Sequence, residues 1–226
     1  MNRYTNIVLA LLLAFFAVQV QAGIVIGGTR VIYNGEKKET STSIRNQEKS
    51  GVYLVQSWVD TGVKGSKAPF IVTPPLFRIN PDEENMLRIV RTGGTLPEDR
   101  ESVFWLNVKS IPATDDSVPQ NNVLQIVVKS RLKLFYRPAG LKGAQEIAYK
   151  NLSVARSGNH LTVSNPTPYY VTLFTLKVDG LEIKEADMVP PKGSVSFTLP
   201  SASGSTVSWQ AISDYGGISQ PESRKL

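Results

Sequence analysis

Residues Asn122 to Pro138 read NVLQIVVKSRLKLFYRP, an extended pattern that no glycine or proline interrupts before its last residue. Apolar side chains recur at period two and would share one face of a strand: Leu124, Ile126, Val128, Leu132, Leu134 and Tyr136. The opposite face is polar and basic, with Gln125, Lys129, Arg131, Lys133 and Arg137. We expect a strand of about fifteen residues here, whereas an ordinary strand has roughly 5–6.

A strand of this length has two interpretations. It can be a long core strand with a solvated back, or its end can overhang the sheet and present an unpaired edge to a partner strand. An overhanging edge with an apolar face is otherwise an aggregation hazard. The pattern alone leaves both interpretations open.

Short strand patterns precede this stretch. A kink at Gly27-Gly28 divides the first of them, and Pro74-Pro75 predicts a bend between two later ones. The runs are Ile24–Ile26, Arg30–Tyr33, Glu39–Arg45, Val52–Asp60, Phe70–Thr73, Leu76–Ile79, Met86–Arg91 and Val103–Ile111. Short strands at this spacing predict an immunoglobulin-like β-sandwich.

The pattern breaks after Pro138, and we expect a hinge at residues 139–143. Strand patterns then resume in Leu152–Ala155, Leu161–Ser164, Val171–Val178, Leu181–Ile183, Val195–Leu199 and Val207–Ser213. Asp179-Gly180 is typical of a tight hairpin turn, and no segment of useful length has a helical period. The prediction is an all-β chain with two sandwich domains, at residues 23–138 and 144–226.

The first 22 residues have the pattern of an export signal. Arg3 is followed by an apolar run from Ile7 to Val18 and by the small-residue cleavage pattern Val20-Gln21-Ala22. We expect cleavage after Ala22. The apolar run is short for a bilayer span and no later stretch is more apolar, so we expect no membrane insertion of the mature chain.

Composition narrows the possible functions. The chain has no cysteine, although an exported protein could form disulfides, so its stability must come from packing and hydrogen bonds. The formal net charge of +6 favours acidic partners in a general way. No block of Lys and Arg with interleaved aromatics occurs in the sequence, so nucleic-acid binding is not predicted.

No catalytic constellation is apparent in the sequence. His160 is the only histidine, and with no cysteine a typical zinc site is nearly excluded. The sequence has no Gly-x-Ser-x-Gly motif for a hydrolase nucleophile, and Asp82-Glu83-Glu84 is typical of a solvated turn. We therefore expect no enzymatic activity, no metal and no cofactor.

Several longer motifs resemble those of one family, the periplasmic pilus chaperones of the chaperone–usher pathway. They lie in order along essentially the whole mature chain: Thr29–Tyr33, Thr73–Arg78, Leu96–Pro112, Lys133–Pro138 and Asn165–Tyr170. The resemblance implies two immunoglobulin-like domains joined at an angle, with a cleft between them. It also implies a periplasmic protein that captures pilus subunits and delivers them to an outer-membrane usher.

The resemblance assigns roles to particular residues. The long strand would complete the subunit's unfinished sandwich, with Leu124, Ile126 and Val128 entering the subunit groove. Arg30 and Lys133 would bind the subunit's C-terminal carboxylate. A salt-bridge network of Glu101, Arg137 and Asp214 would fix the angle between the domains. Self-association through the donor strand is one way for the free protein to hide this apolar edge.

One feature of this assignment needs a structural explanation. Lys133 has the opposite parity from Leu124, Ile126 and Val128, so a bulge or strong twist must intervene if all of them serve one side of the strand.

Other classes remain as alternatives. A secreted adhesive or carbohydrate-binding sandwich would require a cluster of exposed aromatics, whereas Trp58, Trp105 and Trp209 lie inside strand patterns. A secreted hydrolase lacks its usual residues. A pilus subunit would normally have one domain and a disulfide.

Overall fold

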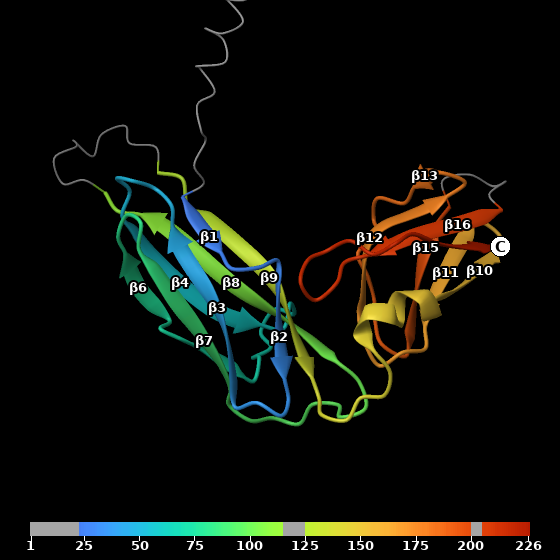
Figure 1. Cartoon of the computed structure of the whole chain (residues 1–226), viewed down its shortest axis with the longest axis horizontal. Helices are drawn as coiled ribbons and strands as arrows, with labels where there is room; N and C mark the ends of the chain where they lie inside the picture. The colour runs from blue at the N-terminus through green and yellow to red at the C-terminus, as the bar shows by residue number, and fades with distance from the viewer. Residues whose placement is uncertain (1–22, 115–124, 200–204) are drawn as a thin grey trace, which may run out of the picture.

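The computed structural model describes residues 23–114, 125–199 and 205–226, so the predicted export signal and Leu124 lie outside the described residues. The described chain forms two β-sandwiches set at an angle (Figure 1). Each has its own buried apolar core. The prediction of an all-β chain with two immunoglobulin-like domains is confirmed.

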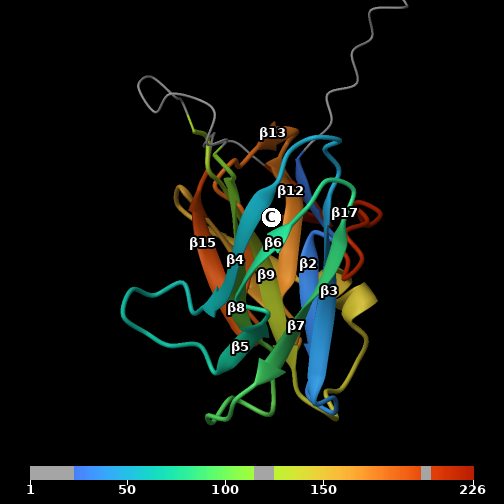
Figure 2. The same cartoon turned by 90° about the vertical axis from the view of Figure 1, so that its left-hand side faces the viewer.

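The N-terminal domain consists of two sheets packed face to face (Figure 2). One sheet has the order β1-β3-β7-β5 and the other β2-β9-β8-β4-β6. The strands are β1 (Ile24–Ile26), β2 (Arg30–Asn34), β3 (Glu39–Asn46), β4 (Tyr53–Asp60), β5 (Phe70–Thr73), β6 (Leu76–Ile79), β7 (Glu84–Arg91), β8 (Ser102–Pro112) and β9 (Val128–Arg137). Alternating residues of the two inner faces form the core, in which Ile44, Leu106 and Leu134 are fully buried.

The first strand changes sheets at Gly27-Gly28. β1 pairs with β3 in one sheet, whereas β2 pairs with β9, in parallel, in the other. Gly28 has a φ of +123°, and a side chain on Gly27 would lie 2.3 Å from Ser43 Oγ. Only glycine adopts the Gly28 conformation without strain, and a side chain on Gly27 would force the Ser43 hydroxyl to move. As a result, β2 pairs only with the C-terminal half of β9, at Lys133–Arg137.

Strand β9 is shorter than the sequence predicts. It begins at Val128, and residues 125–127 are described without strand pairing. If the pairing with β8 continued in the same register beyond Val128, it would need a backbone N–H from Pro112. Proline has no N–H to donate, so the ladder ends at Val128. Instead, the side-chain amide of Gln125 donates to the Pro112 carbonyl at 2.6 Å.

No bulge separates Lys133 from the start of β9. Its pairing with β8 is continuous from Ser110↔Val128 to Ser102↔Tyr136. Val128 and Lys133 therefore lie on opposite faces of an unbroken strand.

The C-terminal domain has a three-stranded sheet, β10-β11-β15, and a second sheet ordered β13-β12-β16-β17, in which β14 also pairs with β12. The strands are β10 (Ser153–Ser157), β11 (His160–Asn165), β12 (Val171–Val178), β13 (Leu181–Glu182), β14 (Met188–Val189), β15 (Gly193–Thr198), β16 (Thr206–Ala211) and β17 (Glu222–Lys225). Trp209, 1% exposed, is one of the largest side chains in the core of this domain.

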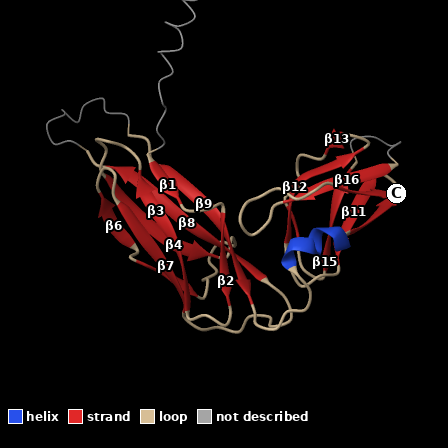
Figure 3. Cartoon of the chain, in the orientation of Figure 1, coloured by secondary structure: helices blue, strands red, loops and turns tan. Residues whose placement is uncertain are grey.

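A short 3-10 helix, η1 (Gln145–Asn151), precedes the strands of this domain, and Figure 3 shows it in blue. The sequence did not predict it, because so short a helix leaves no helical period. It is fixed to the core by Trp209, whose indole N–H donates to the Tyr149 carbonyl at 2.9 Å.

Candidate functional site

Arg30 and Lys133 are neighbours in the cleft between the domains. They are register partners in the parallel β2–β9 pair, so their side chains leave the sheet side by side. Arg30 Nη1 donates to Thr172 Oγ1 at 3.3 Å and to the Ile212 carbonyl at 3.2 Å, both in the C-terminal domain. Lys133 forms an ion pair with Asp187, also in that domain.

The surroundings of Arg30 leave part of its guanidinium without a partner. Burial lowers the pKa of Arg30, and the charges of Asp214 and Asp187 counteract this effect. The buried Nε has no hydrogen-bond partner among the described residues. A buried donor without an acceptor is costly, so this position favours an anionic ligand.

These residues line a cavity of about 360 Å³ between the two domains. Its N-terminal side includes Arg30, Trp105, Arg131 and Lys133. Its C-terminal side includes Thr172, Leu173, Phe174, Asp187, Ile212 and Ile218. The cavity thus has a basic wall opposite a largely apolar one.

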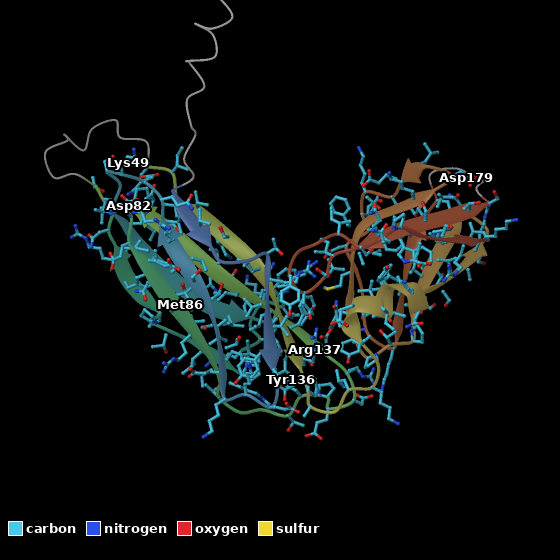
Figure 4. The ribbon with its side chains drawn as sticks, viewed as in Figure 1. Lys49, Asp82, Met86, Tyr136, Arg137 and Asp179 are labelled. Atoms are coloured by element: carbon cyan, nitrogen blue, oxygen red, sulfur yellow. The ribbon has the colours of Figure 1, made fainter. Side chains whose placement is uncertain are left out.

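Glu101, Arg137 and Asp214 lie together at the junction of the domains. Arg137 Nε donates to Glu101 Oε1 at 2.7 Å, and its two Nη groups donate to the Asp214 carboxylate at 2.8 and 3.0 Å. Glu101, 3% exposed, also accepts the Tyr170 N–H at 2.7 Å. Figure 4 shows Arg137 where the two domains meet.

Burial and charge act in opposite directions in this network. Burial alone would lower the pKa of Arg137, but hydrogen bonds and charges from Asp214 and Glu101 raise it. Burial raises the pKa of Glu101, and the charge of Arg137 and the Tyr170 N–H offset only part of that effect. Arg137 therefore stays protonated, and its positive charge stabilises the carboxylates of Glu101 and Asp214.

Phe135 contributes an apolar contact to the same junction. It is 3% exposed although its parity places it on the basic face of β9. Its ring packs against Tyr170, with centroids 5.6 Å apart, and Arg30 lies over it. The sequence pattern did not predict this role for Phe135, because its only signal is an aromatic among basic side chains.

The start of β9 has an open edge and exposed apolar side chains. Lys133–Arg137 pairs with β2, but along Val128–Leu132 no described strand pairs with that edge. Ile126 is 66% and Val128 55% exposed. Further along the same face, Leu132 and Leu134 are buried in the core of the domain. The apolar face of β9 is thus buried in the core at the C-terminal end of the strand and exposed to solvent at its N-terminal end.

The polar face of β9 is held by aromatic and acidic partners. Lys129 Nζ lies 5.1 Å from the centre of the Trp58 ring, and Arg131 Cζ lies 4.2 Å from that of Trp105. Asp60 pairs with Arg131 at 3.0 Å. Burial would raise the pKa of Asp60, but hydrogen bonds from the Gly62 N–H, Asn107 and Arg131 lower it.

Within residues 23–114, 125–199 and 205–226, no three His, Cys, Asp or Glu side chains form a group that could hold a metal ion. His160 is exposed at the start of β11. In the same residues, no helix combines the length and apolarity that crossing a membrane requires.

Comparison with family models gives two matches that together cover most of the chain. Residues 23–142 match the model described as "Pili and flagellar-assembly chaperone, PapD N-terminal domain". Residues 147–223 match "Pili assembly chaperone PapD, C-terminal domain".

Individual relatives agree with these matches. The chain is 46% identical to the probable fimbrial chaperone LpfB of Escherichia coli O157:H7, covering 93% of each chain. It is 44% identical to the chaperone protein FimC of Escherichia coli K12, covering 95% of this chain and 90% of FimC. Among solved structures, the complex of SafA pilin with the SafB chaperone of Salmonella enterica matches with a TM-score of 0.83 and 36% identity, over 92% of this chain and 99% of the other. The Escherichia coli chaperone DraB matches with a TM-score of 0.81 and 41% identity, over 90% and 98%.

Proposed function

This chain belongs to the PapD family of pilus-assembly chaperones, and we propose that it captures a pilus subunit along β9 and in the cleft beside it. In this proposal, the subunit's C-terminal carboxylate binds Arg30 and Lys133. A strand of the subunit lies along the open edge of β9, where Ile126 and Val128 enter its groove. Leu124 is proposed to do the same from outside the described residues.

The open edge of Val128–Leu132 is the observation that carries the proposal. It presents unpaired backbone groups directly beside exposed apolar side chains. A partner strand would satisfy the backbone groups and cover the side chains, as in the strand addition known from chaperone–pilin complexes. Full burial of an Ile or Val side chain contributes roughly 1.5–3 kcal/mol, an upper value because the free edge is partly covered.

The continuous pairing of β9 from Val128 onward is compatible with this arrangement. Its apolar face can enter a subunit while its basic face holds the chain end, because the two groups act on opposite faces of one strand. An extended partner chain beside the edge can contact both faces. The proposal therefore needs no bulge.

The family also supports a location and a route. A similar protein is described as the periplasmic chaperone SfaE, and SafB is described in complex with a pilin. We therefore propose that this chain works in the periplasm after removal of residues 1–22 and passes its subunits to an outer-membrane usher. Self-association through β9 is proposed for the free chain.

The three tryptophans, all within the described residues, do not support the carbohydrate-binding alternative. A sugar would need an open aromatic face, but Lys129 lies over Trp58 and Arg131 over Trp105, and Trp209 is buried. These rings already have partners.

Co-purification with a candidate pilus subunit tests the function. Arg30→Ala and Lys133→Ala should each leave a folded protein that retains far less subunit, because losing one partner of a buried charge pair costs about 2–5 kcal/mol. Arg88→Ala is the control, since it removes an exposed cation paired with Glu39 far from the cleft. Normal retention by the double variant Arg30→Ala/Lys133→Ala would refute the carboxylate site.

A further inference from the structure

The cleft has an apolar wall opposite its two cations. Phe174 is 49% and Ile218 52% exposed, and both line the same cavity as Arg30 and Lys133. Neither residue belongs to the groups assigned above to the chain end, the donor edge or the domain junction.

Phe174 reaches the cleft because of a β-bulge. The pairing of β12 with β16 shifts between Leu173 and Thr175, so Phe174 is the extra residue. Leu173 and Leu176 are both buried although they are three positions apart, so the inward alternation slips by one residue between them. In a regular strand Phe174 would share the inward face with Leu176. The bulge turns this large aromatic out of the core and into the cavity.

Ile218 arrives from a separate segment, after β16. It is held by a bridge to Ile212, whose carbonyl accepts the Arg30 hydrogen bond. Two independent segments therefore place exposed apolar side chains beside the basic pair. Leaving such side chains uncovered forgoes the stabilisation that their burial against a ligand would contribute. An exposed apolar patch in a cavity marks a binding surface.

We propose that Phe174 and Ile218 form a subsite for an apolar side chain at one of the last two positions of the captured subunit. The inference rests on the proposed function and adds a side-chain preference to it. Charge complementarity places the chain end, because Arg30 and Lys133 select a carboxylate. Side chains alternate along an extended chain, so one of the last two faces this apolar wall while the other points away from it. The cavity volume of about 360 Å³ suits such a chain end.

Binding of matched synthetic peptides to the full mature chain tests the subsite. The peptides alternate Val and Thr, carry Phe, Leu, Ala or Ser at each of the last two positions, and are made with a free or an amidated C-terminus. Fluorescence anisotropy gives their dissociation constants. We expect Phe or Leu at one of the two positions to bind about tenfold more tightly than Ser, since partial burial of one side chain suffices for that factor.

Two variants identify the residues responsible. Phe174→Ser, alone or with Ile218→Ser, should abolish the side-chain preference and retain the loss of binding on amidation. Leu181→Ser is the control, because Leu181 is an equally exposed apolar residue (53%) on β13 of the same domain, outside the cavity. It should leave the preference unchanged.

The outcomes separate the subsite from the proposed function. Dependence on the free carboxylate without any side-chain preference would overturn the subsite and leave the carboxylate site intact. A preference that Phe174→Ser abolishes, without an effect of amidation, would support the subsite and refute the carboxylate site. A preference that survives both substitutions would overturn the subsite, and failure of every peptide to bind would overturn both.

Discussion

Lys133 and Asp187 form an ion pair across the cleft, from one domain to the other. The lysine side chain is only 14% exposed, whereas the aspartate side chain is 62% exposed. A largely buried ammonium group is therefore paired with a solvent-exposed carboxylate. In the proposed function, the subunit's terminal carboxylate has to displace Asp187 from this ammonium group.

Asp187→Asn should tighten binding of a peptide or subunit with a free C-terminal carboxylate. The variant removes the competing anion and leaves Lys133 in place. Exposed ion pairs contribute about 0.2–1 kcal/mol, so we expect up to about a fivefold gain in affinity. Anisotropy titrations at low salt would measure it. Glu185→Gln makes the same change of charge two residues away on an exposed side chain, and an equal gain there would show a general charge effect instead.

Ile126→Asp and Val128→Asp should each abolish subunit retention without lowering the melting temperature of the free protein. Both side chains are more than half exposed, so no buried charge is created in the free chain. Leu132→Asp, on the same face but 7% exposed, should by contrast destabilise the fold. Ile71→Asp is the matched control, because it changes a 52% exposed residue on β5, in the other sheet. Melting of Ile126→Asp at a much lower temperature would return this segment to the core-strand interpretation.

Arg137→Ala should destabilise the chain and loosen the angle between its domains. It leaves Glu101 buried without its cation, a change that typically costs roughly 3–5 kcal/mol. Thermal melts and small-angle scattering would measure the two effects. Arg88→Ala, which breaks an exposed pair with Glu39, should change neither measurement. If Arg137→Ala behaved like this control, the junction network would have no role in fixing the domains.

Asp60 should make the chain sensitive to acid. Its carboxyl pKa is lowered in the folded state, so its contribution to stability is present above the unfolded pKa and is lost as the pH falls through the folded one. Melting temperatures between about pH 5 and pH 2 should therefore fall less steeply for Asp60→Asn than for the wild type. Glu36→Gln changes an exposed carboxylate with no ion-pair partner in the described chain, and its profile should follow the wild type. Parallel profiles for Asp60→Asn and the wild type would contradict this assignment.

The sequence predicted those parts of the fold in which side chains alternate without interruption. Leu132, Leu134 and Tyr136 keep period two and are buried as expected. Asp179 and Gly180 form the predicted hairpin turn, with φ values of 45° and 84°. Patterns of this kind report local geometry directly, because each residue's face depends only on its position in the strand.

Features that depend on a partner strand were not predictable from the pattern. The bulge at Phe174 shifts the alternation of β12, and it becomes visible only in the register with β16. The early end of the pairing at Val128 depends on Pro112 in another strand. For the site, the resemblance named Arg30, Lys133 and Arg137, but the contacts of Asp187 and Phe135 come from segments far away in sequence.

The change of sheet at Gly27-Gly28 has a consequence for protein engineering. Residues larger than glycine at positions 27 and 28 disfavour the passage of the chain from one sheet to the other. If β1 instead continued in line with β2 beside β9, its backbone would pair with the open edge of Val128–Leu132. Such a domain would gain backbone hydrogen bonds and lose the open edge of β9 at which a partner strand can pair. Selection for thermal stability alone would therefore enrich variants that melt at higher temperature but no longer bind a subunit. A library of variants at these positions has to be screened for subunit binding as well as for stability.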